Sequence, residues 1–283
     1  MTDQASPVLA LTMGEPAGIG GEITLKAWTR RAEGLAPFFI IDDPARLQSL
    51  ARNLGLAAPI KVIERPGEAA AIFVSALPVL KTSLAADTVP GKPEPANAEA
   101  VMAAIETAVR LTMDGEAGAV VTNPIHKSTL YKAGFSYPGH TEFLAALSGI
   151  DTAPVMMLAA DDLRVVPVTI HQSLAAAVRD LNTLAITQAG LITAAALQSD
   201  FGLTRPRIAV AGLNPHAGEG GAMGSEEAEI IRPAVEALRD AGIEAFGPVP
   251  ADTLFTPRKR ETFDAALCMY HDQIGRASCR ERV

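Results

Sequence analysis

Aromatic and cysteine residues are scarce in this sequence. Only 5% of its 283 residues are Phe, Trp or Tyr, although 48% are hydrophobic. A core with so few rings must rely on Ala, Val, Ile and Leu, which is typical of parallel sheets covered by helices. The chain has only two cysteines, Cys268 and Cys279, which are too few for a disulfide scaffold.

Positive charge is also in deficit. The chain has 24 Lys and Arg against 32 Asp and Glu, and its net charge of −8 argues against nucleic acid as a main partner. An anionic ligand would then need a helix N-terminus, a metal ion or single basic residues. The sequence has no apolar run of membrane-spanning length, and residues 1–13 lack the basic start of a secretory signal. We expect a cytoplasmic protein that binds neither membranes nor nucleic acid.

Short β-branched runs alternate with helical patterns along the chain. Helices are expected over residues 96–113, 142–147, 183–199 and 227–241, and strands over residues 8–13, 38–41, 61–63, 73–74, 118–122, 155–158, 163–170, 208–212 and 265–270. This alternation predicts an α/β fold with ligand groups at the carboxyl ends of parallel strands.

The usual nucleotide and nucleophile motifs are absent. The turn at residues 14–22, GEPAGIGGE, has neither the GxGxxG nor the P-loop spacing, so it could contact a ligand or serve only packing. After the second strand, Asp42 or Asp43 could hold a ribose hydroxyl, but Asp before Pro44 is an ordinary helix cap, which we favour. There is no GxSxG motif, and Cys268 lies within a strand pattern, where an inert thiol is expected.

Two polar segments suit an anion. The strand at 118–122 runs into Asn123-Pro124-Ile125-His126-Lys127, where Lys127 could neutralise a phosphate or carboxylate or be a surface residue after a proline turn. His140 and Thr141 open the next helix, where free backbone N–H groups favour an anion. Thr141 could instead be a simple helix cap.

Three histidines each follow a predicted strand: His171, His216 and His271. His216 lies in the glycine-rich segment 213–227, LNPHAGEGGAMGSEE. Because the carboxyl ends of parallel strands share one edge, these imidazoles could converge on a divalent metal ion with open positions for substrate. Asp252 and Asp272 could orient them. The spacing alone is a weak signal, because no local metal-binding motif is present.

Seven segments together resemble the 4-hydroxythreonine-4-phosphate dehydrogenase family. They occur in the family's order between residues 8 and 273, and LNPHAGEGG with MYHDQ is a specific combination. The segments are GEPAGIG (14–20), TNPIHK (122–127), GHTEF (139–143), the turn at His171, LNPHAGEGG (213–221), PADTLF (250–255) and MYHDQ (269–273).

The resemblance implies a fold similar to isocitrate and isopropylmalate dehydrogenases, with two α/β/α domains around a cleft. We expect the first domain over residues 1–122, to which 256–273 could also belong, and the second over 123–255. The resemblance implies metal ligands at His171, His216 and His271, supplied from both chains of a homodimer, and substrate contacts at His140 and Thr141. It assigns no residue to the nicotinamide nucleotide and none as the catalytic base.

The implied reaction is the NAD- or NADP-dependent oxidation of 4-phosphohydroxy-L-threonine, followed by decarboxylation, in pyridoxine biosynthesis. The substrate is a small phosphorylated amino acid, and the metal (zinc, magnesium or cobalt) would act as a Lewis acid on its hydroxyl. Two alternatives stay open. One is a related dehydrogenase of a 4-phospho-sugar acid or a cis-dihydrodiol, and the other is a fragment that binds metal or phosphate without turnover.

The chain departs from the family after Gln273. Family members continue for some tens of residues that include substrate contacts, whereas residues 274–283 here, IGRASCRERV, have no strand or core pattern and resemble a translated sequencing adapter. We expect this decapeptide to be a non-native tail, and we expect the chain as written to be poorly active and less stable.

Overall fold

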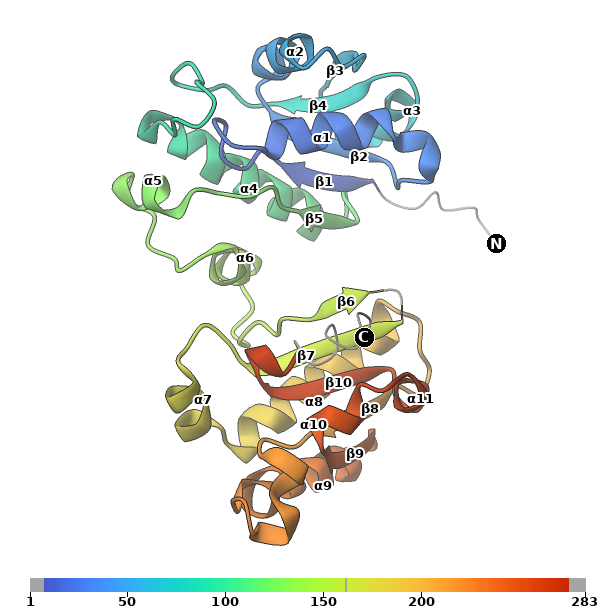
Figure 1. The fold of residues 1–283 in the computed structure, drawn as a ribbon. Helices are drawn as coiled ribbons and strands as arrows, with labels where there is room; N and C mark the ends of the chain where they lie inside the picture. Colours follow the sequence, from blue (N-terminus) through green and yellow to red (C-terminus); the bar gives the residue numbers. More distant parts are fainter. Residues whose placement is uncertain (1–7, 161, 275–283) are drawn as a thin grey trace. The chain divides into compact units, whose positions relative to one another are not determined.

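The computed structural model describes residues 8–160 and 162–274, and its contacts divide the chain into two compact units between Pro154 and Val155. Each unit holds one five-stranded sheet with helices on both faces (Figure 1). The predicted class, two α/β/α domains, is confirmed. None of the helices in the described part of the chain has the length and apolar character needed to span a bilayer. Apart from Ile274, the expected tail lies outside the described residues.

Unit 1 is built on a parallel sheet with the strand order β3-β4-β2-β1-β5. Its strands are β1 (Leu9–Thr12), β2 (Phe38–Asp42), β3 (Ile60–Ile63), β4 (Leu77–Lys81) and β5 (Ala119–Val121). Its helices are α1 (Gly20–Thr29), α2 (Pro44–Asn53), α3 (Ala69–Phe73), α4 (Ala98–Met113), α5 (Lys127–Lys132) and α6 (His140–Ser148), with short 3₁₀ turns η1 (Arg31–Glu33), η2 (Pro66–Glu68) and η3 (Pro95–Asn97).

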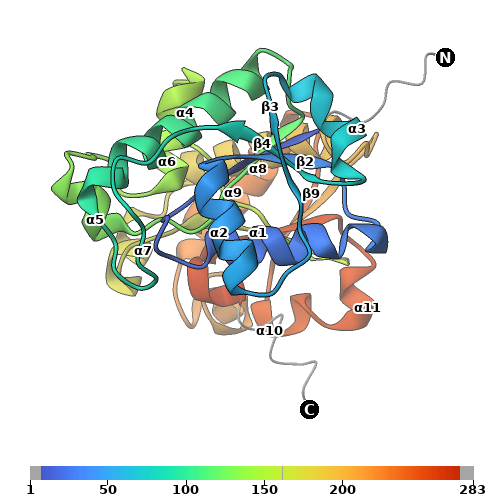
Figure 2. The same cartoon turned by 90° about the horizontal axis from the view of Figure 1, so that it is seen from above.

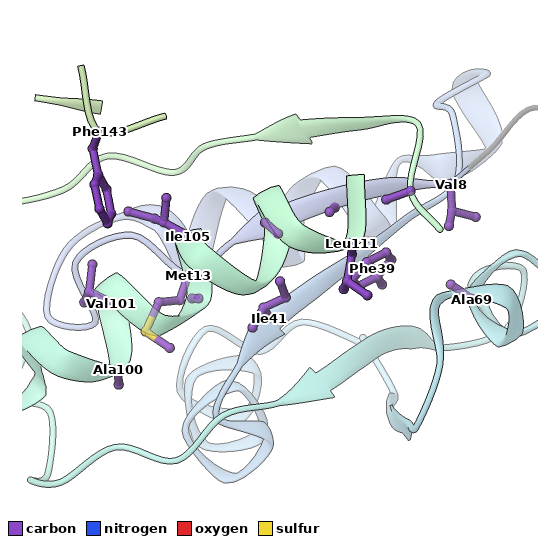
Figure 3. Packing of buried hydrophobic residues seen from close by; sticks show 14 of the residues in the cluster. Val8, Met13, Phe39, Ile41, Ala69, Ala100, Val101, Ile105, Leu111 and Phe143 are labelled. Carbon is purple, nitrogen blue, oxygen red and sulfur yellow. The ribbon is translucent and has the colours of Figure 1, made fainter. Parts of the chain in front are cut away.

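Helix α4 and the α1–α2 pair cover opposite faces of this sheet (Figures 1 and 2). Successive strand residues point to opposite faces, so Phe39 of β2 joins the layer of Ile105 from α4, whereas Ile40 joins that of Trp28 from α1. Figure 3 shows the α4 layer from close by. Each such large apolar side chain contributes about 1.5–3 kcal/mol to the stability of the fold when it is fully buried. This packing holds the sheet, and with it the loops that follow its strands, in place.

Unit 2 has the strand order β6-β7-β10-β8-β9, in which only β6 runs antiparallel to its neighbour. Its strands are β6 (Leu158–Ala160), β7 (Leu163–Thr169), β8 (Arg207–Ala211), β9 (Glu244–Val249) and β10 (Ala265–Tyr270). Its helices are α7 (Leu174–Asp180), α8 (Thr183–Ser199), α9 (Arg232–Asp240), α10 (Ala251–Leu254) and α11 (Pro257–Arg260), with the 3₁₀ segments η4 (Pro215–Gly221) and η6 (His271–Ile274) and a π-helical turn η5 (Glu227–Ile231).

The faces of the second sheet are covered in the same way. Leu267 of β10 packs in one layer with Leu238 of α9, whereas the adjacent Cys268 packs in the other with Phe255, which follows α10. The pleat of β10 therefore divides a continuous apolar run between two helical layers.

The structure differs from the expected domain boundaries. Leu130, Phe135 and Phe143 belong to the core of unit 1, so the first unit extends past residue 122 to Pro154. Strand β10 pairs with β7 and β8, so residues 256–273 belong to unit 2 and do not return to unit 1.

Three strands were missed or misplaced in the prediction from the sequence: β9 was not expected, β4 was expected at residues 73–74, and β6 was expected at residues 155–158 but spans Leu158–Ala160. The segment expected as a strand at residues 73–74 ends the alanine-rich helix α3, and the strand is β4, four residues further on. Pro78 within β4, and Gly247 with Pro248 within β9, obscured both strands, because these residues are rare inside sheets.

The loop that follows β1 packs directly on the loop that follows β5. Gly14 has a φ of +66°, and a Cβ on this residue would lie 2.6 Å from the carbonyl oxygen of Pro124 and 2.8 Å from Cβ of Asn123. Only glycine satisfies both the left-handed backbone and this close approach.

Replacing Gly14 with Ala is expected to lower the free energy of unfolding of unit 1 by about 3 kcal/mol or more, because it adds a backbone clash to the left-handed strain. Gly115→Ala is the matched control, since Gly115 has a φ of +76° with nothing within 4 Å of its added Cβ. The control is expected to cost only about 1 kcal/mol. Urea unfolding followed by fluorescence of Trp28, the single tryptophan, measures both. Equal losses would contradict the clash.

Candidate functional site

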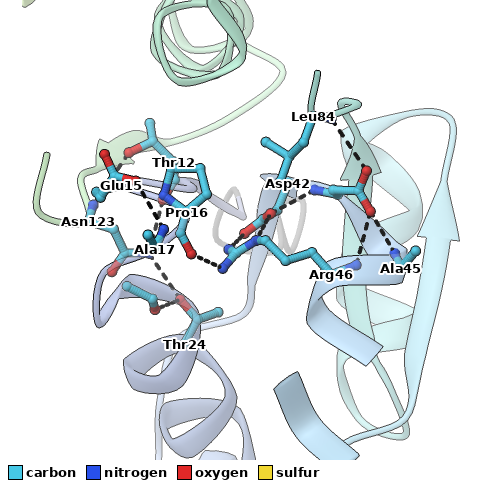
Figure 4. A network of polar contacts seen from close by, with 12 residues as sticks. Thr12, Glu15, Pro16, Ala17, Thr24, Asp42, Ala45, Arg46, Leu84 and Asn123 are labelled. Carbon is cyan, nitrogen blue, oxygen red and sulfur yellow. Dashed lines mark hydrogen bonds and ion pairs between the residues drawn. The ribbon is translucent and has the colours of Figure 1, made fainter. Parts of the chain in front are cut away.

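At the carboxyl edge of the first sheet, hydrogen bonds join the loop that follows β1 to the loop that follows β5. The amide N–H of Glu15 donates to the carbonyl of Pro124 at 2.8 Å, and the Glu15 carboxyl group accepts from the N–H of Ala17 at 3.0 Å. The amide of Asn123 donates to the carbonyl of Thr12 at 2.9 Å and to the hydroxyl of Thr24 at 3.0 Å (Figure 4). The GEPAG turn and the NPIHK segment are thus held as one platform.

An ion pair holds the same platform from the side of β2. Asp42 is fully buried and pairs with Arg46 of α2, whose Nη1 also donates to the carbonyl of Pro16 at 3.0 Å (Figure 4). Burial raises the pKa of the Asp42 carboxyl, against the opposing attraction of Arg46. Asp43 accepts from the N–H groups of Ala45 and Arg46, so the favoured interpretation of the Asp before Pro44 as a helix cap is confirmed.

Helix α6 begins without a cap. Gly139 precedes it and offers no side chain, and the backbone N–H groups of His140, Thr141 and Glu142 have no acceptor among the described residues. Thr141 does not act as the simple cap that was the alternative. Nε2 of His140 is buried and also has no partner within the described chain. Burial, and next the charge of Lys127, lowers the pKa of His140, so its ring is neutral at physiological pH.

The second sheet brings the three predicted histidines to one edge. Strands β7, β10 and β8 are parallel neighbours, and His171, His271 and His216 follow them in that order. All three side chains are exposed. The expected placement at adjacent strand ends therefore matches the topology of unit 2.

The loops carrying these histidines adopt unusual backbone conformations. His171 has a φ of +54° and His216 a φ of +52°, and residues 216–220 form a continuous left-handed run that also holds Ala217 and Glu219 at positive φ. Such strain at non-glycine residues concentrates at ligand-binding positions. Nδ1 of His271 lies 2.9 Å from a carboxyl oxygen of Asp272, which can orient the ring as the sequence predicted.

Among the described residues, the three histidine side chains do not assemble into a metal site. Across residues 8–160 and 162–274, no three His, Cys, Asp or Glu side chains lie close enough together to hold a metal ion. Asp252 lies in α10, which packs against η4, but it makes no hydrogen bond to a histidine in the described chain. By donor type and strand placement the histidines fit a divalent cation, and their role as ligands stays a prediction.

Sequence reasoning missed the groups that support the histidine loops. Glu227 is buried, and its carboxyl oxygens accept from the backbone N–H of Asn214 at 2.7 Å and from the side-chain amide of Asn214 at 3.0 Å. Buried Gln273 donates to the carbonyl of Gly212 at 2.7 Å and accepts from the N–H of Met269 at 2.6 Å. These contacts tie the end of β8 to η5 and to β10. The SEE and HDQ segments carried these residues, but only burial distinguishes them from surface charges.

Cys268 takes no part in this chemistry. It is buried within β10, and burial raises the pKa of its thiol to about 12. The residue is therefore a protonated thiol at neutral pH and not a nucleophile, as expected from its strand position.

Known proteins resemble this chain in sequence and in fold. Residues 34–277 match the family model described as pyridoxal phosphate biosynthetic protein PdxA. A relative from Caulobacter vibrioides named 4-hydroxythreonine-4-phosphate dehydrogenase is 50% identical over 270 residues, which cover 94% of this chain and 80% of the relative. The crystal structure of 4-hydroxythreonine-4-phosphate dehydrogenase from Klebsiella pneumoniae is 36% identical, with a TM-score of 0.87 over 95% of this chain and 82% of that chain.

A more distant match is a terephthalate 1,2-cis-dihydrodioldehydrogenase from Burkholderia xenovorans LB400, which is 30% identical with a TM-score of 0.65 over 95% of this chain and 80% of that chain. The fold defines a two-unit α/β protein, and the names of these relatives and solved structures place it among dehydrogenases. The chain belongs to the pyridoxal phosphate biosynthetic protein PdxA family, and the resemblance drawn from its motifs is confirmed.

Glu227→Gln is expected to loosen the loop that carries His216, because an amide would place an N–H group against a donor of Asn214. The loss in stability should be about 1–3 kcal/mol, the cost of an unsatisfied buried group. Hydrogen exchange of the amides at residues 213–224 measures the local effect and should become faster. Glu229→Gln is the control, since Glu229 is exposed on the same turn. Unchanged exchange in Glu227→Gln would refute the supporting role.

Proposed function

We propose that this chain catalyses the NAD(P)-dependent oxidation of 4-phosphohydroxy-L-threonine to 2-amino-3-oxo-4-phosphooxybutanoate, which decarboxylates to 3-amino-2-oxopropyl phosphate in the biosynthesis of pyridoxal 5'-phosphate. The observation that carries the proposal is the 50% identity, over 94% of this chain, to a relative named for that dehydrogenase activity. The uncapped start of α6 and the histidine edge of unit 2 supply groups of the kinds that this reaction needs.

His140 and Thr141 are proposed to bind the substrate. Their backbone N–H groups stand free at the positive end of α6, where anionic oxygens are favoured. The neutral ring of His140 adds an unpaired Nε2, which can bond to a substrate oxygen. This arrangement fixes one end of the molecule and leaves its hydroxyl-bearing carbon free to be oriented.

His171, His216 and His271 are proposed to hold one divalent cation, zinc, magnesium or cobalt. When bound, such an ion lowers the pKa of a coordinated alcohol and stabilises negative charge on oxygen. We propose that two chains of a homodimer share this site, as the family resemblance of the motifs implies. Asp272 keeps the ring of His271 oriented through Nδ1.

The reaction balances as an alcohol oxidation and a carbon–carbon cleavage. A hydride passes from the carbon that bears the hydroxyl to NAD⁺ or NADP⁺, and the hydroxyl proton leaves. The bond to the carboxylate carbon of the resulting β-keto acid then breaks, carbon dioxide departs, and a proton replaces it. The protein's part is to orient the substrate and exclude competing reactions.

The comparisons favour this reaction over both alternatives. The dihydrodiol dehydrogenase match has 30% identity and a TM-score of 0.65, against 36% and 0.87 for the crystal structure named for the phosphothreonine activity. A fragment that binds without turnover predicts metal binding with no NADH or NADPH formed from any candidate substrate.

The test is the formation of NADH or NADPH from 4-phosphohydroxy-L-threonine, a 4-phospho-sugar acid and a cis-dihydrodiol, each with and without a chelator. This chain spans 80% of the Caulobacter relative. The assay therefore uses two proteins: this chain, and a chimera in which the residues after Gln273 are replaced by the corresponding C-terminal residues of the relative. Turnover of the phosphothreonine substrate, abolished by the chelator, is expected. Turnover of only another substrate would overturn the proposal.

His216→Ala is expected to lower both zinc affinity and turnover by at least about 100-fold, because it removes a ligand of the proposed ion. Calorimetric titration with zinc measures the first effect and the coupled NADH assay the second. His126→Ala is the control for zinc binding, because His126 is an exposed imidazole of unit 1. If both variants bind zinc like the unmodified chain, the histidine site is wrong.

A further inference from the structure

We propose that Lys127 is a further substrate-binding residue, whose ammonium group pairs with the phosphate of the substrate at the N-terminus of α6. The inference rests on the proposed function, because it concerns the same substrate. It adds a charged partner to His140 and Thr141, which by themselves offer only neutral donors.

The position of the ammonium group is the first support. A Cβ on Gly139 would lie 3.3 Å from Nζ of Lys127 and 3.4 Å from its Cε, so the side chain lies over the residue that precedes α6. The backbone of α5 is anchored beneath it. Leu130 is buried, and Nδ1 of His126 lies 2.6 Å from Oγ1 of Thr129. Lys127 is therefore presented by a fixed turn.

The electrostatics are the second support. A cation next to the positive end of a helix is unfavourable unless an anion lies nearby. Lys127 makes no ion pair or hydrogen bond within the described residues. Glu142, in the first turn of α6, has Oε2 3.6 Å from the same Gly139 Cβ position, so a carboxylate lies close by, but no ion pair joins it to Lys127 among the described residues. The free N–H groups and the unpaired ammonium are thus left for a ligand.

The ligand that fits is a phosphate group. Three backbone N–H groups and one ammonium match the several oxygens and double charge of a phosphate better than a carboxylate. His140 completes the set as a neutral partner, because its burial and the neighbouring Lys127 charge keep its pKa low. Lys127 then provides the positive charge that attracts the phosphate, and Nε2 of His140 provides a hydrogen bond that orients it.

The experiment compares Lys127→Met with Lys127→Arg, and with Lys132→Met as the control on the exposed end of α5. The full chain is titrated calorimetrically with inorganic phosphate and, separately, with L-threonine, which carries a carboxylate but no phosphate. Lys127→Met is expected to weaken phosphate binding by about 10- to 100-fold, as for loss of one charge-assisted bond. Lys127→Arg should retain most of the affinity, and Lys132→Met all of it.

Two further readouts separate binding from a merely structural effect. The ring resonances of His140, identified by comparison with His140→Asn, should titrate at higher pH in Lys127→Met, because one cause of the lowered pKa is gone while burial and Glu142 remain. In the chimera, KM for the phosphorylated substrate should rise with kcat little changed, the pattern for lost uniform binding. Trp28 fluorescence checks that unit 1 stays folded.

Phosphate binding that is unchanged in Lys127→Met would overturn the inference, and so would an effect confined to L-threonine. The proposed function fails separately. Suppose that neither the chain nor the chimera oxidises the phosphothreonine substrate, yet phosphate binding depends on Lys127. The contact between Lys127 and phosphate is then supported, and the proposed reaction is refuted. If turnover is normal in Lys127→Met at low substrate concentration, the reaction stands and the role of Lys127 falls.

Discussion

Parallel strand pairing is the constraint on which the rest of this protein depends. Because β7, β10 and β8 run in the same direction side by side, their following loops leave from one edge, and three histidines far apart in sequence become neighbours in topology. The pairing of β1 with β5 does the same in unit 1, where it brings the GEPAG turn against the NPIHK segment. Cores on both faces of each sheet hold these edges in place.

Buried polar contacts convert the edges into defined loops. Arg46 links β2 to the turn after β1, and Gln273 links the end of β10 to the end of β8. The carboxyl group of Glu227 accepts two hydrogen bonds from Asn214 and so holds the start of the loop that carries His216. A buried partner of this kind is costly to remove, because the remaining donor or acceptor keeps its desolvation penalty. Sites held in this way can be precise although they lie on loops.

The sequence predicted most strands, both long helices and the placement of the candidate ligands, because β-branched runs and strand-end polar residues are local signals. It failed where the signal was not local. Pro78 concealed β4, and the end of unit 1 depends on Leu130 and Phe143, whose packing partners are distant in sequence. The roles of Glu227 and Gln273 could not be predicted either, since a buried carboxyl or amide group looks like a surface residue until its partners are known. The position of Lys127 beside Gly139 could not be predicted, because it depends on the path of the chain between α5 and α6.

The left-handed run at residues 216–220 lowers the stability of the native backbone but fixes the position of the His216 ring. His216, Ala217 and Glu219 each occupy a conformation that costs an L-residue roughly 1–2 kcal/mol. Exchanging Ala217 for glycine would relieve that cost in the native state, but it would also give the loop alternative paths and spread the position of the imidazole beside it. A glycine at position 217 would therefore exchange a precisely placed His216 ring for lower strain in the native backbone.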